Sequence, residues 1–145
     1  MAQQFLSELK IPAHADYIPV AKRVAASLGS KLGFSLEELD ELCIAVTQAC
    51  DSAIEASEDA WGTGGMLKLS YGATGKGMEV EVEAVAPGRA ALAGRRHVAH
   101  VPQVQEMELR RLAQEMIRLF VDDFRSQVDA GRGQVRFRMV KYVLR

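Results

Sequence analysis

Several residue types and patterns are scarce in this sequence, and each scarcity excludes a class of protein. The 145 residues include only two cysteines and four prolines, which argues against a disulfide scaffold or a proline-rich disordered chain. No apolar run approaches the ~18 residues that a membrane span needs, and no basic segment followed by an apolar one indicates a secretory signal. The formal net charge of −1 disfavours general nucleic-acid binding.

The remaining composition is that of an ordinary globular protein. Hydrophobic residues make up 48% of the chain and charged residues 26%, both near the average for soluble domains. A chain of this length can bury a core without a disulfide or metal. We therefore expect one domain spanning residues 1–145.

The two cysteines, Cys43 and Cys50, lie seven residues apart in a segment with helical periodicity. Seven residues of helix rise about 10 Å, which is too far for a disulfide. We interpret both as buried thiols in a reducing cytoplasm.

Charge is distributed unevenly along the chain. Residues 36–60 contain eight acidic residues and no lysine or arginine, whereas residues 132–145 contain five basic residues and no acidic one. Residues 86–104 contain three arginines and two histidines without an acid. This asymmetry is compatible with charged protein partners and also with ordinary solvated faces.

The first half of the chain predicts one strand and two helices. Residues 4–11 alternate like a strand that Pro12 ends, and Asp16 is a candidate cap for a helix that stops at Gly29 or Gly33. Residues 35–38 (Ser-Leu-Glu-Glu) form a capping box. The apolar stripe behind it predicts a helix to about residue 58.

The second half predicts a hairpin, a long loop, a helix and a strand. Residues 66–71 and 78–85 are strand-like, and the glycine-rich residues 72–77 between them match a hairpin turn better than a phosphate loop. Residues 86–104 are expected to form a loop. A helix is predicted from Met107 to about Gln127, with the following side chains as its core stripe: Leu109, Leu112, Met116, Leu119, Phe120 and Phe124. A final strand follows Gly133.

This order of elements predicts a two-layer α+β sandwich, with an antiparallel-leaning sheet and helices on one face. Catalytic signatures are few. His97 and His100 could share a metal on a helix, but no acid or cysteine nearby completes a zinc site, so surface histidines are favoured. Asp122 and Asp123 are interpreted as solvated residues late in a helix. Trp61 is interpreted as a loop anchor over the edge of the core.

Residues 11–54, IPAHADYIPVAKRVAASLGSKLGFSLEELDELCIAVTQACDSAI, resemble the N-terminal half of RsbW/SpoIIAB-type anti-sigma factors. These are serine-protein kinases of the GHKL ATPase superfamily, whose helix reads roughly D-x-x-x-A-V-x-E-A-x-x-N-A. The last strand, with Lys141-Tyr142, agrees more loosely. The resemblance implies a GHKL (histidine-kinase-like ATPase) fold with a mixed, mainly antiparallel sheet.

The chain departs from this family at each nucleotide-binding motif. Where the family has its general-base Glu and its magnesium-binding Asn, this chain has Gln48 and Ser52. An amide takes no proton at neutral pH, and a serine hydroxyl is a weak magnesium ligand. Asp51 and Glu55 lie nearby, but about 100° around the helix or one turn further on.

The other two motifs are also altered. The family's Asp-x-Gly-x-Gly corresponds to residues 83–89, with Glu83 near the position of the aspartate and Gly88 as the one glycine. The expected phosphate-binding glycines are absent from residues 107–112, where Glu108 would repel phosphate and Arg110 and Arg111 would attract it. We therefore expect no cofactor, with weak Mg-ATP binding as the alternative.

The resemblance and the departures together favour an anti-sigma regulatory factor that acts by protein binding. The implied partners are a sigma factor, a STAS-type anti-anti-sigma protein and a second copy of the chain. Lys22 falls where the family has a partner-contacting basic residue, with Arg23 beside it. The basic loop with Arg95 and Arg96 is a second candidate contact surface. Alternatives are an active serine-protein kinase, or an inactive subunit that dimerises with an active paralogue.

Overall fold

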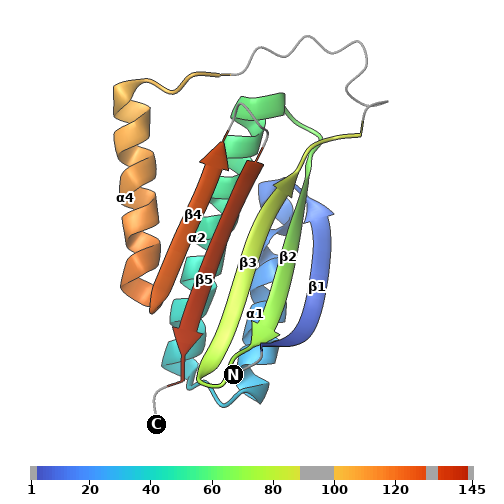
Figure 1. Ribbon diagram of the computed structural model, residues 1–145, viewed down its shortest axis with the longest axis vertical. Helices are drawn as coiled ribbons and strands as arrows, with labels where there is room; N and C mark the ends of the chain where they lie inside the picture. Colours follow the sequence, from blue (N-terminus) through green and yellow to red (C-terminus); the bar gives the residue numbers. More distant parts are fainter. Residues whose placement is uncertain (1–2, 89–99, 130–133, 144–145) are drawn as a thin grey trace.

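The computed structural model describes residues 3–88, 100–129 and 134–143 of the chain. They form a five-stranded sheet in the order β1-β2-β3-β5-β4, in which every described strand pair is antiparallel. Figure 1 shows α1 and α2 behind this sheet and α4 beside its β4 edge. The strands are β1 (Gln4–Pro12), β2 (Met66–Ala73), β3 (Gly77–Val85), β4 (Asp123–Asp129) and β5 (Gln134–Tyr142). The helices are the 3-10 turn η1 (Ala15–Tyr17), α1 (Ile18–Lys31), α2 (Leu36–Trp61) and α4 (Val104–Phe120).

The predicted α+β sandwich is confirmed, with the core between the sheet and the helices. Alanines at the inner faces of α1 and α2, among them Ala21 and Ala45, are fully buried and let the helices approach the strands closely. The hydroxyl of Tyr71 donates to the carbonyl of Ala21 at 2.9 Å, which ties β2 to α1. None of the described helices combines the length and apolar content that crossing a membrane requires.

The two cysteines are both free thiols but differ in burial. Cys50 is buried as predicted, and burial raises the pKa of its thiol to about 12. Cys43 is only half-buried, which corrects the prediction that both are buried. Its Sγ donates to the carbonyl of Lys22 at 3.7 Å, because α1 crosses this side of α2.

The helices of the first half follow local signals with one exception. Ser35 and Glu38 form the predicted capping box at the start of α2, and Gly33 (φ 92°) follows the end of α1. The prediction that Asp16 caps α1 is wrong. Asp16 lies inside the 3-10 turn, where its backbone N–H donates to His14 Nδ1 at 3.1 Å, and α1 begins without a side-chain cap.

The prediction that Trp61 lies in a loop is wrong. Trp61 is the last residue of α2 and is buried, so the helix runs three residues past the predicted end at residue 58. Residues 72–77 contain the predicted hairpin turn, in which the Thr74 N–H donates to the carbonyl of Gly77 at 2.9 Å. The side chain of Thr74 holds this turn, because its Oγ1 accepts from the backbone N–H of Lys76 at 3.2 Å and of Gly77 at 2.9 Å.

The predicted helix from Met107 to Gln127 is wrong in its last third. α4 ends at Phe120, and residues 123–129 form β4, which pairs with β5. The backbone amide of Tyr142 donates to Asp122 Oδ2 at 2.7 Å, and the Phe124 ring stacks on Phe137. The open edge of β5 therefore supplies partners that outweigh the helical periodicity. Asp122 and Asp123 accordingly lie at a helix–strand junction.

Four of the six side chains predicted to form the core stripe of this helix point outward, whereas Phe120 packs against the core and Phe124, which lies on β4, is buried in it. Leu109, Leu112, Met116 and Leu119 are 68%, 55%, 46% and 79% exposed. The buried residue of α4 is Ile117, which is 0% exposed. The helix lies beside the sheet edge rather than over its centre, so only a narrow strip of its surface is covered.

Candidate functional site

Gln48 and Ser52 lie one turn apart on α2 but line two different hollows. Gln48 belongs to a hollow on the α1 side of α2, lined also by Lys22, Asp40, Cys43, Ile44 and Thr47. Ser52 belongs to a hollow on the α4 side, lined by Glu55, Ala56, Arg110, Gln114, Val128 and Phe137. The two positions that the resemblance implies for proton transfer and magnesium therefore do not share a cavity in the described part of the chain.

The hollow beside Ser52 is small. Its volume is about 110 Å³, whereas pockets for small-molecule ligands usually span about 300–1,000 Å³. Ser52 itself is half-buried, and Asp51 next to it is exposed. The hollow at Ser52 is thus below this range, whereas the hollow that Gln48 lines has a volume of about 530 Å³.

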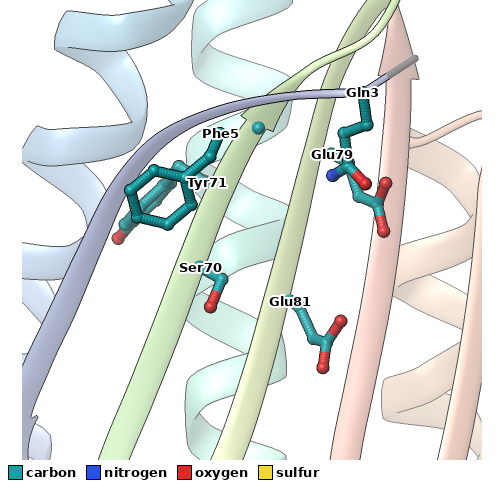
Figure 2. A pocket seen from close by; sticks show the side chains of 7 residues that line it. Gln3, Phe5, Ser70, Tyr71, Glu79 and Glu81 are labelled. Atoms are coloured by element: carbon teal, nitrogen blue, oxygen red, sulfur yellow. The ribbon is translucent and has the colours of Figure 1, made fainter. Parts of the chain in front are cut away.

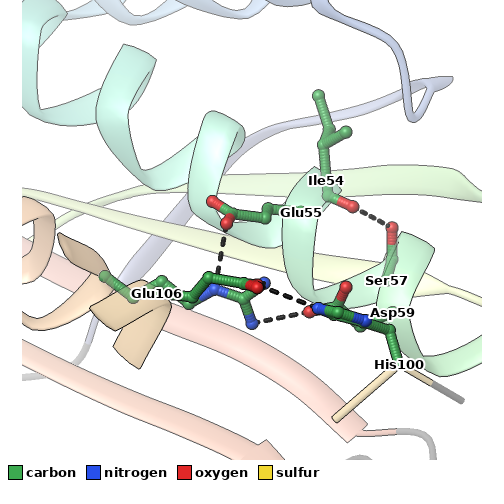
Figure 3. A network of polar contacts seen from close by, with 7 residues as sticks. Ile54, Glu55, Ser57, Asp59, His100 and Glu106 are labelled. Carbon is green, nitrogen blue, oxygen red and sulfur yellow. Dashed lines mark hydrogen bonds and ion pairs between the residues drawn. The ribbon is translucent and has the colours of Figure 1, made fainter. Parts of the chain in front are cut away.

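A network of hydrogen bonds and ion pairs links α2 to the start of α4 (Figure 3). Arg110 Nε lies 2.9 Å from Glu55 Oε1, and another guanidinium nitrogen lies 2.6 Å from Asp59 Oδ2. His100 Nε2 lies 2.9 Å from Glu106 Oε2, and this hydrogen bond raises the pKa of His100 above its ordinary value. Arg110 and Glu55 therefore form an ion pair with each other. In this arrangement Arg110 does not bind a phosphate and Glu55 does not accept a proton.

Glu83 lies on the sheet face opposite the helices. Along β3, Met78, Val80, Val82 and Ala84 are buried in the core, so the alternating glutamates at 79, 81 and 83 point to the other face. There Arg136 Nε lies 3.0 Å from Glu81, and its terminal nitrogen lies 3.4 Å from Glu83. The structure thus does not bring Glu83 together with Gln48 or Ser52.

The same open face has a shallow hollow at its β1 side. It is lined by Gln3, Phe5, Ser70, Tyr71, Gly72, Glu79 and Glu81, and Figure 2 shows the two glutamates one above the other along β3. The described residues that line this hollow include two carboxylates and no basic side chain, which makes it unsuited to a phosphate-bearing ligand. Gly88, after β3, is exposed and has nothing within 4 Å of where a Cβ would stand.

These placements test whether the described residues fit Mg-ATP, the cofactor that the resemblance implies. Gln48 offers no base, Ser52 lines a hollow of about 110 Å³, and Glu83 lies on the opposite face of the sheet. Among the described residues there is also no group of three or more histidine, cysteine or acidic side chains placed to hold a metal ion. At these three positions, the described residues do not fit the nucleotide.

The candidate contact residues Lys22 and Arg23 are both exposed on α1. Lys22 lines the hollow that contains Gln48, together with Ile44, which is 42% exposed. A basic and an apolar side chain thus lie together at this hollow. Arg95, Arg96 and His97 lie outside the described residues.

One buried ion pair was not predicted. Lys141 is 6% exposed, and its Nζ lies 2.8 Å from both Glu41 Oε2 and the carbonyl of Phe120. It therefore links β5, α2 and the end of α4. The available signal was its position, since Lys141 continues the inward alternation of Val135, Phe137 and Met139 along β5.

Comparison with known proteins finds similarity to one group of enzymes. No protein-family model matches the chain. Proteins named serine-protein kinase RsbW match it at 28% identity over 75 residues in Bacillus licheniformis, 36% over 50 in Bacillus pumilus and 31% over 48 in Bacillus subtilis. These matches cover 52%, 34% and 33% of this chain and 47%, 31% and 30% of the relatives.

The chain therefore spans less than half the length of the curated relatives it matches. Within that span, the resemblance to RsbW-type proteins that the sequence predicts is confirmed.

Proposed function

We propose that this chain is a cytoplasmic anti-sigma regulatory factor of GHKL-like fold that acts by protein binding and has lost kinase chemistry. Its partners would be a sigma factor, a STAS-type anti-anti-sigma protein and a second copy of itself. The similarity to RsbW proteins supports the regulatory role. The single observation that supports the loss of kinase activity is that Gln48, Ser52 and Glu83 line three different hollows.

The chemistry of these side chains supports the same conclusion. A protein-serine kinase needs a group that accepts the hydroxyl proton and a site that holds magnesium on the phosphates. The amide of Gln48 is not a base, and Glu55, the carboxylate that lines the hollow of Ser52, is paired with Arg110. Partner binding needs neither function, and the surface around Lys22 remains exposed for it.

An active kinase is the second candidate, because the relatives are themselves named serine-protein kinases. In this chain Asp40 is the one carboxylate among the described residues that line the hollow of Gln48. A kinase would have to use that carboxylate as its base. It would also have to bind the nucleotide on the α1 side of α2.

Substituting Lys22→Glu is expected to weaken binding of the sigma factor or STAS partner at least tenfold without unfolding the protein. Lys22 is exposed, so the change reverses a surface charge without disturbing the core. The measurement is capture of sigma factors and STAS proteins from the same genome by the purified chain, followed by titration calorimetry on the protein captured.

Lys10→Glu is the matched control, because it makes the same charge change on exposed β1. Retained binding in Lys10→Glu together with loss in Lys22→Glu supports the proposal. If both variants bind the partner as tightly as wild type does, α1 is not the contact surface. Failure to capture either class of partner would overturn the proposed function.

A further inference from the structure

The outward apolar stripe of α4 is a large hydrophobic surface that nothing in the described chain covers. It consists of Leu109, Leu112, Met116 and Leu119, which are 46–79% exposed. Four large apolar side chains in one line on a helix surface are unusual unless another molecule covers them. The helix is held to its own chain by the other side, through Ile117 and Arg110.

The spacing of the apolar stripe specifies the shape of its partner. The intervals between successive members are three, four and three residues, which is the a/d spacing of a helix that packs along a second helix. A flat sheet or an extended peptide does not match this narrow seam. The stripe therefore fits another α-helix, aligned along α4.

The spacing of the apolar stripe is the same when the helix is turned end for end. Because the intervals are symmetric, an antiparallel second copy places Leu109 opposite Leu119 and Leu112 opposite Met116. A two-fold dimer requires this kind of self-complementary surface. α4 meets the requirement with its own sequence.

The charges beside the apolar stripe are self-complementary in the same arrangement. Glu108, Arg111, Glu115 and Arg118 follow one flank with alternating sign, and within one helix they form exposed pairs between Arg111 and Glu108 and between Arg118 and Glu115. In an antiparallel pair this flank faces its own copy, so each Arg111 approaches the Glu115 of the second chain. The two Glu115 side chains then lie near the two-fold axis between two arginines, which offsets their repulsion.

We infer that the apolar stripe of α4 is a homodimer interface, formed by antiparallel packing of two α4 helices about a two-fold axis. The inference rests on the second-copy partner in the proposed function and names the surface for it. α4 has 17 residues, so this contact is smaller than the standard 1,600 Å² interface. We expect a dissociation constant in the micromolar range, on the order of 1–50 µM, rather than an obligate dimer.

The test compares the sedimentation of wild type, Leu112→Glu and Leu36→Glu by analytical ultracentrifugation between 1 and 200 µM. Wild type is expected to show a monomer–dimer equilibrium, and Leu112→Glu to weaken it at least tenfold, with an unchanged melting temperature at 1 µM protein, where self-association contributes little. Leu36 is 82% exposed at the start of α2, so Leu36→Glu should dimerise like wild type.

The antiparallel register has its own test. Arg111→Glu should weaken the dimer, because the substituted carboxylate would lie near Glu115 of the second chain. Adding Glu115→Arg should restore the dimer, since the swap re-forms opposite charges across the axis. A double variant that stays as weak as the single one would overturn the antiparallel arrangement.

The remaining outcomes separate this inference from the proposed function. A dimer that Leu112→Glu leaves intact would overturn the α4 interface while keeping the homodimer. A chain that is monomeric at 200 µM would overturn the interface and the homodimer together, whereas sigma-factor binding through Lys22 is measured independently. A melting temperature several degrees lower in Leu112→Glu at 1 µM protein, where self-association contributes little, would mean that the chain covers the apolar stripe itself, which also overturns the inference.

Discussion

Replacing Ile117 by alanine is expected to lower the free energy of unfolding by about 3 kcal/mol. Ile117 is 0% exposed and is the buried residue of α4, so the truncation removes apolar contacts and leaves a cavity where α4 meets the core. In a domain of this size the loss corresponds to a melting temperature about 10 °C lower. Urea unfolding measures the change directly through the shift of its midpoint.

The matched control is Leu119→Ala on the same helix. Leu119 is 79% exposed, so its truncation should change the unfolding free energy by less than about 0.5 kcal/mol. Both variants are to be measured at 1 µM protein, where self-association contributes little. Equal losses in the two variants would contradict the orientation of α4 described here and would favour the core stripe that its sequence predicts.

Gly77→Ala is expected to destabilise the protein by about 3 kcal/mol for a different reason. Gly77 begins β3 opposite Tyr142 of β5. A Cβ at Gly77 would stand 2.0 Å from the carbonyl oxygen of Lys141 and 2.8 Å from the Cα of Tyr142. Both are backbone atoms, so one strand must move. That movement would also displace Lys141 from Glu41 and from the end of α4.

Gly88→Ala is the control for this substitution, because nothing lies within 4 Å of its Cβ position. It should leave thermal unfolding within about 1 °C of wild type. Circular dichroism melts of the two variants provide the measurement. A Gly77→Ala protein as stable as wild type would mean that the β3–β5 pairing at this end is looser than the structure describes.

The elements that sequence predicts best are those with signals in their own residues. The Ser35–Glu38 capping box locates the start of α2 to the residue, because both hydrogen bonds are local. The hairpin at residues 74–76 is likewise held by short-range contacts, in which Thr74 Oγ1 accepts from the backbone N–H of Lys76 and Gly77. The alternation of Val135, Phe137 and Met139 identifies the buried face of β5.

The elements that sequence misses depend on partners outside their own segment. Residues 123–129 continue the helical pattern of α4, yet they become β4 because β5, later in the chain, offers an open edge. The amphipathic pattern of α4 has two candidate faces, and periodicity alone does not say which one meets the core. Lys141 shows the same limit, since its partner Glu41 lies 100 residues earlier.

The candidate site likewise has features that local sequence predicts and features that depend on distant elements. The residue identities at Gln48 and Ser52 are visible in sequence and already argue against kinase chemistry. Their separation into different hollows depends on where α1 and α4 lie against α2, which no local pattern specifies. The position of Glu83 could have been predicted, because Val80, Val82 and Ala84 define the inward parity of β3 and leave Glu83 on the other face.

The central claim is that the chain works without a nucleotide, and thermal unfolding with and without millimolar Mg-ATP tests it most directly. A ligand at ~100 times its dissociation constant stabilises the native state by about 2.7 kcal/mol, which would raise the melting temperature by about 5–10 °C. We predict no change with Mg-ATP or with Mg-ADP. A rise of several degrees with either nucleotide would contradict the account and would favour an active kinase.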